Sequence, residues 1–180
     1  LLVISKSSGG EMRGREAAER RAAVTLTAGG EVIQQSDCEV LLGATVHHSG
    51  TWTAMIRDSK ASVQAQLRSR VNALKKICQH ADLKTMKMVA AGIITSKLLY
   101  MLPLFGAAPD FLMRTLQVQQ MAAARAVVGP RAFRWSNLRT LSFLGWLNVR
   151  QLYVVGLLTL THKIVQSGKP TNLSRSIVSA

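Results

Sequence analysis

The spacing of apolar residues changes near Trp52, where a period of two gives way to a helical period of about 3.6 residues. Before this point, LLVISK predicts a short apolar strand, SSGGEMRG predicts a loop, and EAAERRAA has helical composition with little periodicity. VTLTAGGEVI alternates around Gly29 and Gly30 and predicts a β-hairpin, because glycine tolerates the positive φ of a tight turn. We expect three or four short strands, which extend a larger sheet or pack on the helices because they are too few to form their own core.

The run EVLLGATVHHSGTW predicts one further strand and a turn. Val40, Leu42 and Val46 have the composition of a buried strand, and Gly43 within it allows another backbone to approach closely. Ser49–Gly50 then predicts a turn that leads into the helical part.

Beyond Trp52, the apolar spacing predicts one long helix with two different faces. Its apolar stripe contains Ile56, Val63, Leu67, Val71, Leu74 and Cys78. A second set lies about a quarter turn away and contains Arg57, Gln64, Arg68 and Lys75. We therefore expect a helix that packs through one face and carries positive charge beside it.

A second helix is expected to begin at Asp82, a suitable N-cap, and to run to about Leu102, where Pro103 stops it. Its composition is apolar on most sides, so we expect it to be largely buried. Polar residues at 95–97 make a membrane span the less favoured alternative.

Three more helices follow, each with a recognisable start or end. One opens at Pro109–Asp110 and is ended by Gly129–Pro130. The next two are expected at Ser136 or Asn137 to Ser142, and at Asn148 to about Gln166, with Gly145 between them. Regular structure is expected to end at Gly168–Lys169–Pro170.

A chain of 180 residues is expected to form one domain, or one domain with an appended subdomain. It carries a formal charge of +14, but residues 1–50 hold five basic and six acidic residues, so the excess lies in the helical part. The positive electrostatic field of this part favours binding to polyanions, of which nucleic acid is the first candidate and an anionic membrane surface the second. A merely soluble cationic surface is the alternative. Because the sequence lacks an initiating Met and opens on a strand-like run, we expect it to be a fragment.

Candidate catalytic chemistry is sparse. The acidic residues are isolated, so they do not supply the neighbouring carboxylates of a two-metal site. His47 and His48 are adjacent on an expected strand and would point to opposite faces. Cys38 and Cys78 match no disulfide or zinc spacing, which fits a reducing compartment. No catalytic or metal-binding residues are therefore expected.

The segment RAFRW alternates Phe133 and Trp135 with arginines. Such rings could stack on bases while the guanidinium groups bind phosphates. The interpretation that we favour is a loop whose Trp fills a gap between helices.

The order of these motifs resembles the C-terminal side of the reverse transcriptase of non-LTR (LINE-type) retrotransposons. LLVISK is similar to the strand leaving the palm, LLGATVHHSGTW to the "LG" strand before the thumb, and the helix with LRSRVNALKKI to the one that follows. SKLLYMLPLFG resembles the S-x-L-x-Y segment, LQVQQMAAARAVVG the "LQ-x-x-Q…R" helix, and LSFLGWLNVRQL the "LGWL" connection. Each motif is short, but the motifs occur in the same order as in the family, and together they cover nearly the whole chain.

The resemblance implies an α+β fold with short N-terminal strands before a mainly helical thumb and connection. Residues 1–51 would form the palm edge and a primer-grip-like hairpin, 52–128 the thumb-like bundle, and 129–180 the connection segment. These parts would hold the RNA–DNA template-primer duplex near the active site. The implied contacts are the backbone of Leu42 and Gly43 and the side chains of Arg57, Lys60, Arg68, Lys75 and Lys76.

The Tyr/Phe-x-Asp-Asp motif that carries the family's catalysis does not occur in this sequence. The parent would thus be an RNA-directed DNA polymerase that uses Mg²⁺, while this piece alone would be non-catalytic and need no cofactor. Its partners would be the duplex and the palm and fingers of the same polymerase, not a membrane, in the nucleus or cytoplasm. The alternative is an independent basic helical adaptor that binds a protein partner or an anionic membrane surface.

Overall fold

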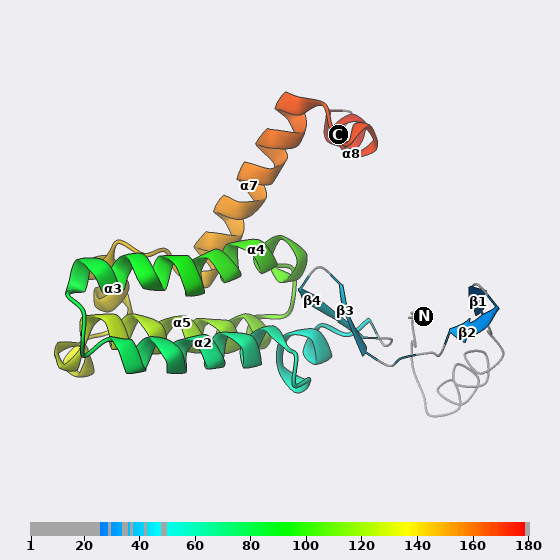
Figure 1. The fold of residues 1–180 in the computed structure, drawn as a ribbon. Helices are drawn as coiled ribbons and strands as arrows, with labels where there is room; N and C mark the ends of the chain where they lie inside the picture. The colour runs from blue at the N-terminus through cyan, green and yellow to red at the C-terminus, as the bar shows by residue number, and fades with distance from the viewer. Residues whose placement is uncertain are drawn as a thin grey trace. The chain divides into compact units, whose positions relative to one another are not determined.

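The computed structural model describes residues 26–28, 30–33, 36, 38–41, 43–47 and 50–178. The expectations for LLVISK, SSGGEMRG, EAAERRAA and Leu42 lie outside these residues. The chain divides into an N-terminal unit, Leu1–Ala65, and a helical unit, Gln66–Ala180. Short strands precede a mainly helical part, which confirms the α+β class in its coarse form (Figure 1).

The described strands of the N-terminal unit form two separate hairpins. Strands β1 (Leu26–Ala28) and β2 (Glu31–Ile33) pair antiparallel next to Gly30, whose φ is 87°, which confirms the hairpin expected there. Strands β3 (Cys38–Leu41) and β4 (Ala44–His47) also pair antiparallel, and β4 lies against the short helix that follows.

The expectation of one buried strand through Val40 and Val46 is wrong. The chain reverses between β3 and β4, where Gly43 has a φ of 76°, and Val40 is 56% exposed. Glycine at positive φ favours a tight reversal over a continuous strand, and a two-stranded hairpin leaves one face to solvent. The turn expected next is present, since the Gly50 N–H donates to the His47 carbonyl at 2.9 Å.

The long helix expected from Ile56 to Cys78 is interrupted. A π-helical turn, η1 (Ala54–Asp58), ends at Ser59 in an extended conformation, and α2 (Val63–Ile77) begins afterwards. The buried Ser62 hydroxyl donates to the Arg57 carbonyl at 3.2 Å and accepts from the Ala65 N–H at 3.3 Å. This local cap competes with a continuous helix, and the apolar spacing did not reveal it.

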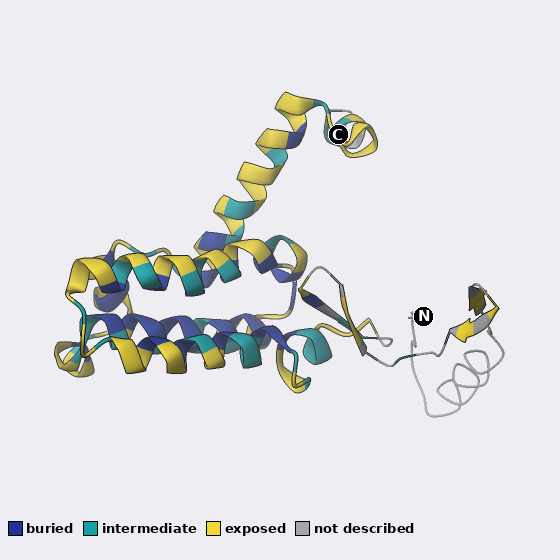
Figure 2. Ribbon diagram, viewed as in Figure 1, coloured by how far each residue is buried: buried dark blue, intermediate teal, exposed yellow. Residues whose placement is uncertain are grey.

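Three helical rods in the helical unit run alongside one another. The first rod is α2. The chain returns along a second rod, a continuous helix made of α3 (Leu83–Ala90), η2 (Ala91–Thr95) and α4 (Ser96–Phe105), and runs back along the third rod, α5 (Asp110–Val128) (Figure 1). Their facing sides are buried, as at Leu67, Ile94 and Leu116 (Figure 2). The Arg70 guanidinium donates to the Ile93 carbonyl at 2.8 Å, so this cation ties α2 to η2.

The second helix departs from expectation in its length and in its burial. It includes Pro103 and ends at Phe105, two residues later, so the missing N–H affects only the last turn. Met88, Tyr100 and Leu104 are exposed, because neighbouring helices cover only part of its circumference. By length and composition Leu83–Phe105 could cross a membrane, and 33% of its most apolar window is buried.

The remaining helices are η3 (Pro130–Arg134), α6 (Asn137–Leu144), α7 (Val149–Ser167) and α8 (Thr171–Val178). Of these, α6 and α7 begin at the expected caps, whereas η3 replaces the loop expected for RAFRW. The Ser136 hydroxyl accepts from the Arg139 N–H, and Asn148 forms a reciprocal capping box with Gln151. Gly145, with a φ of 68°, separates α6 from α7 as expected. The expected end of regular structure after Gly168 is wrong, because α8 follows.

Two glutamines of α5 hold the connection before α7. Gln117 accepts from the Val149 N–H at 2.9 Å and donates to Gln120, while Gln120 donates to the Leu147 carbonyl at 2.8 Å. Gln120 is buried and Gln117 is half-buried, and amides that are satisfied in this way fix one arrangement of the chain. The motifs LQVQQ and LGWLN therefore depend on each other for their hydrogen bonds.

We expect the N-cap of α3 to stabilise the chain in a pH-dependent way. Hydrogen bonding from Thr85 lowers the pKa of Asp82, because the ionised carboxylate is the better acceptor. The stabilisation is complete above about pH 4, the unfolded pKa, and is lost as the pH falls through the lower folded pKa. Thermal unfolding of Asp82→Ala should show a lower Tm than the wild type at pH 7, and the difference should shrink below pH 4.

Asp82→Asn is the matched control, since an asparagine still caps the helix but does not titrate. It should retain most of the wild-type Tm at pH 7. An equal loss in both variants at every pH would contradict a charge-dependent cap.

Candidate nucleic-acid interface

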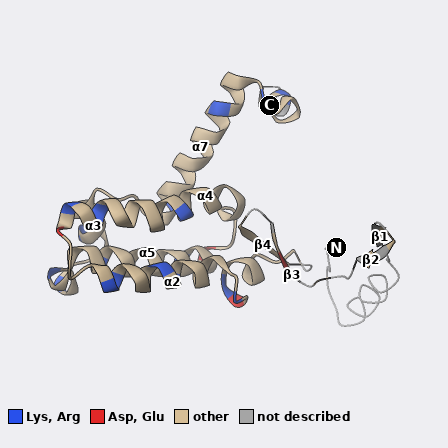
Figure 3. Ribbon diagram, in the orientation of Figure 1, with Lys and Arg blue, Asp and Glu red and all other residues tan. Residues whose placement is uncertain are grey.

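The positive charge of the chain belongs to the helical unit. Residues 66–180 contain sixteen Lys and Arg residues against Asp82 and Asp110, which gives a formal charge of +14, whereas residues 1–65 contain seven of each sign. Of the two carboxylates, Asp82 caps α3 and Asp110 pairs with Arg150. Most of the cations in this unit therefore have no carboxylate of the same unit available to them (Figure 3).

Helix α2 presents three of the expected contact residues to solvent. Arg68, Lys75 and Lys76 are exposed, while Leu67 and Leu74 beside them are fully buried. Arg68 and Lys75 are seven residues apart, which places them on the same side of the helix about 10 Å apart along its axis. The apolar stripe of α2 is confirmed, and its basic side is free to meet a polyanion.

The other expected contacts belong to the N-terminal unit. Leu42 lies outside the described residues, and Gly43 is exposed, so its backbone is accessible. Arg57 and Lys60 are also exposed, but they precede α2 and do not belong to its basic side. The Arg57 Nε lies 2.6 Å from the Asp58 carboxylate. This hydrogen bond is the main cause that raises the pKa of Arg57, and the negative charge of Asp58 adds to it. A neighbouring carboxylate makes Arg57 a weaker phosphate contact than Lys60.

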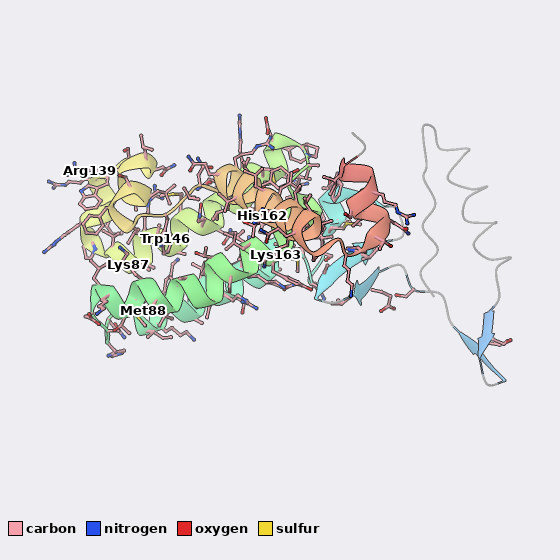
Figure 4. All side chains as sticks on the ribbon, turned by 90° about the horizontal axis from the view of Figure 1, so that it is seen from above. Lys87, Met88, Arg139, Trp146, His162 and Lys163 are labelled. Atoms are coloured by element: carbon pink, nitrogen blue, oxygen red, sulfur yellow. The ribbon has the colours of Figure 1, made fainter. Side chains whose placement is uncertain are left out.

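Half of the cations in the helical unit gather at one end of it, which we call the basic end. Segments 75–87 and 125–139 meet there, because Cys78 and Leu83 line the same cavity as Ala126 and Arg131. Figure 4 likewise shows Lys87 and Arg139 at the same end. The cations of the basic end are Lys75, Lys76, Lys84, Lys87, Arg125, Arg131, Arg134 and Arg139. Asp82 is the only acidic residue in these segments.

A groove of about 390 Å³ opens at the basic end between α2, α5 and η3. Lys75 lines it from α2, Cys78 from the turn after α2, Arg125 from α5, and Phe133 from η3. A second cavity of about 380 Å³ shares Cys78 and adds Arg131. Among the described residues, none that lines either cavity is acidic. We call the first cavity the Phe133 groove.

The two aromatic residues of RAFRW have different environments. Trp135 packs edge-on against Phe143, with ring centroids 5.1 Å apart, and the Arg139 guanidinium lies 4.8 Å from its ring. This agrees with the interpretation of Trp135 as a residue that fills a gap between helices. Phe133, in contrast, is 86% exposed.

The sequence-based selection missed Arg125 and Arg131. They are separated from Lys75 by about fifty residues of sequence, and no periodicity links them. The RAFRW segment contains Arg131 and could have indicated that residue, whereas no signal in the sequence indicates Arg125. Lys97 was also not selected; burial is the main cause that lowers its pKa, and the charge of Arg70 adds to it.

Among the described residues, no group of three or more His, Cys, Asp or Glu side chains could hold a metal ion. Comparisons with protein-family models, with curated proteins and with solved structures gave no match to this chain.

Proposed function

We propose that this chain binds a nucleic-acid duplex through its sugar–phosphate backbone and that it is the thumb and connection part of a retrotransposon reverse transcriptase. The observation that carries the proposal is the charge of +14 on the helical unit, with half of its cations at the basic end. Phosphate contacts fix position without reading sequence. A surface of this kind suits a protein that must accept every template.

The geometry of α2 supports the same conclusion. Its buried side anchors it to the other helices, so Arg68 and Lys75 are held on a rigid element. Cations on a packed helix lose less freedom on binding than cations on a loose segment. The accessible backbone at Gly43 is consistent with a second contact from the N-terminal unit.

The finer assignment to a reverse transcriptase depends on the order of the motifs. The structure adds a physical link between two of them, because Gln117 and Gln120 of LQVQQ bind the backbone of the LSFLGWLNVRQL connection, at Val149 and Leu147. The parent polymerase would supply the catalytic carboxylates and Mg²⁺ from its palm. The present chain would hold the duplex.

A second candidate is a basic helical adaptor, and exposed apolar side chains favour it. Tyr100 and Leu104 of α4, and Val154 and Leu158 of α7, are all more than half exposed. Such surfaces contact protein partners or the acyl region of an anionic membrane.

Paired binding assays separate the two functions. The chain should bind a labelled RNA–DNA duplex in fluorescence anisotropy, with similar affinity for unrelated sequences. Its log affinity should fall with log salt at a slope of roughly −0.9 for each phosphate contacted. Flotation with vesicles containing phosphatidylserine measures the alternative. Flotation without duplex binding would overturn the proposal in favour of the adaptor, and the absence of both would reject duplex binding and membrane binding.

A further inference from the structure

Phe133 is a large apolar side chain that the fold leaves in solvent. It is 86% exposed, although Trp135, two residues later, is half-buried and packs against Phe143 of α6. Single exposed apolar residues are common on protein surfaces. The position of Phe133 differs because it lies at the rim of a groove that cations surround.

The segment that carries Phe133 is held in place at both ends. Gly129, with a φ of 77°, ends α5 and allows Pro130 to begin η3. The Ala132 N–H donates to the Gly129 carbonyl at 3.0 Å, and the Trp135 N–H donates to the Ala132 carbonyl at 3.1 Å. With Trp135 packed against Phe143, the ring of Phe133 is presented from a fixed turn. An aromatic ring held in advance loses little entropy when a planar ligand stacks on it.

The chemistry around the ring selects its ligand. Lys75 and Arg125 line the Phe133 groove, and Arg131 lines the adjoining cavity. The Arg125 guanidinium donates a hydrogen bond to the side-chain oxygen of Asn137 at 2.9 Å. Because Asn137 is neutral, this hydrogen bond does not neutralise the positive charge of Arg125. A flat ring with cations and without carboxylates fits a nucleotide, whose base stacks while its phosphate meets the ammonium and guanidinium groups. The groove volume of about 390 Å³ falls within the usual range for small-ligand sites.

We propose that the Phe133 groove binds one unpaired nucleotide of a single-stranded extension next to the duplex. The base stacks on Phe133, and its phosphate is neutralised by Lys75 and Arg125. This proposal rests on the proposed duplex binding for the placement of the strand. The stacking site goes beyond duplex binding, because it gives the chain a preference for a junction between paired and unpaired nucleic acid.

The test compares a blunt RNA–DNA duplex with the same duplex carrying a five-nucleotide single-stranded overhang, in fluorescence anisotropy with the full 180-residue chain. The wild type should bind the overhang duplex more tightly. Phe133→Ala should weaken overhang binding by about 5- to 150-fold, the effect of losing one stacked base. It should leave binding to the blunt duplex unchanged.

Three variants isolate the stacking. Phe133→Trp should retain the preference for the overhang, and Phe133→Leu should lose it, because leucine is apolar but cannot stack. Leu138→Ala is the matched control, since Leu138 is 79% exposed on α6 and does not line the Phe133 groove. It should bind both substrates as the wild type does.

The outcomes distinguish this inference from the proposed function. If the wild type binds both duplexes equally, or if Phe133→Leu keeps the preference, the stacking site is overturned while duplex binding stands. If the wild type fails to bind the blunt duplex but binds the overhang duplex through Phe133, the proposed duplex binding fails while the stacking of an unpaired base on Phe133 stands. A loss of vesicle flotation in Phe133→Ala, without any effect on the overhang, would assign the ring to a membrane contact and overturn the proposal.

Discussion

Reversing the charge of Arg68 and Lys75 together should weaken binding to an RNA–DNA duplex by roughly 10- to 100-fold near 0.1 M salt. Both side chains are exposed on the same side of α2, and Lys75 also lines the Phe133 groove. Each lost phosphate contact also removes a released counterion, so the salt slope should become shallower by about two units for the pair. Anisotropy titrations of Arg68→Glu/Lys75→Glu at several salt concentrations measure both effects.

A control with the same change in net charge shows whether position matters. Lys163→Glu/Arg175→Glu places the reversals on α7 and α8, and Figure 4 shows Lys163 away from the end that carries Arg139. This variant should lose far less affinity and keep the wild-type salt slope. Equal losses in the two double variants would mean that only the total charge matters, and α2 would no longer be the interface. Circular dichroism should confirm that both variants remain folded.

Gly106→Ala should lower the free energy of unfolding by about 1–3 kcal/mol, which is the usual cost of overpacking. Gly106 caps α4 with an ordinary φ of −66°, so alanine would not strain the backbone. A Cβ at this position would instead overlap the ring of Tyr153 from α7. Because α4 and α7 are neighbours through this contact, either the ring or the helix must move. Urea unfolding followed by circular dichroism measures the loss.

Two further variants test the cause. Gly92→Ala is the same substitution at a helical site with no neighbour within 4 Å of the new Cβ, and it should be neutral or stabilising by up to about 1 kcal/mol. In a double-mutant cycle, the combined Gly106→Ala/Tyr153→Ala change should cost less than the sum of the single changes, because removing the ring relieves the overlap. If Gly106→Ala behaves like Gly92→Ala, the close approach of α4 and α7 is refuted.

The part of the fold that the sequence predicted well is the set of helix boundaries fixed by local hydrogen bonds. Asp82, Ser136 and Asn148 each cap the helix that follows, and Gly145 ends α6 in the left-handed conformation. These interactions join residues only a few positions apart. They depend little on the rest of the molecule, so residue types and spacing suffice to find them.

The sequence-based predictions were wrong where two local signals competed, or where contact with a neighbouring helix determined the backbone conformation. The apolar spacing from Ile56 to Cys78 was real, yet Ser62 broke the helix with a cap of its own. Pro103 is a helix-stop signal, but it occupies the last turn of α4 and lies near Gly156 of α7. Periodicity reports which residues become buried, whereas the continuity of the backbone depends on specific hydrogen bonds.

The candidate site shows the same division. The sequence alone determined the sign and amount of charge, the α+β class and the basic side of α2, since composition and helical spacing are properties of contiguous residues. Only the tertiary structure brought Lys75 together with Arg125 and Phe133, and only it left Phe133 in solvent while burying part of Trp135. About fifty residues separate Lys75 from Arg125. Their proximity results from the packing of α2 beside α5, a contact that no pattern along the chain encodes.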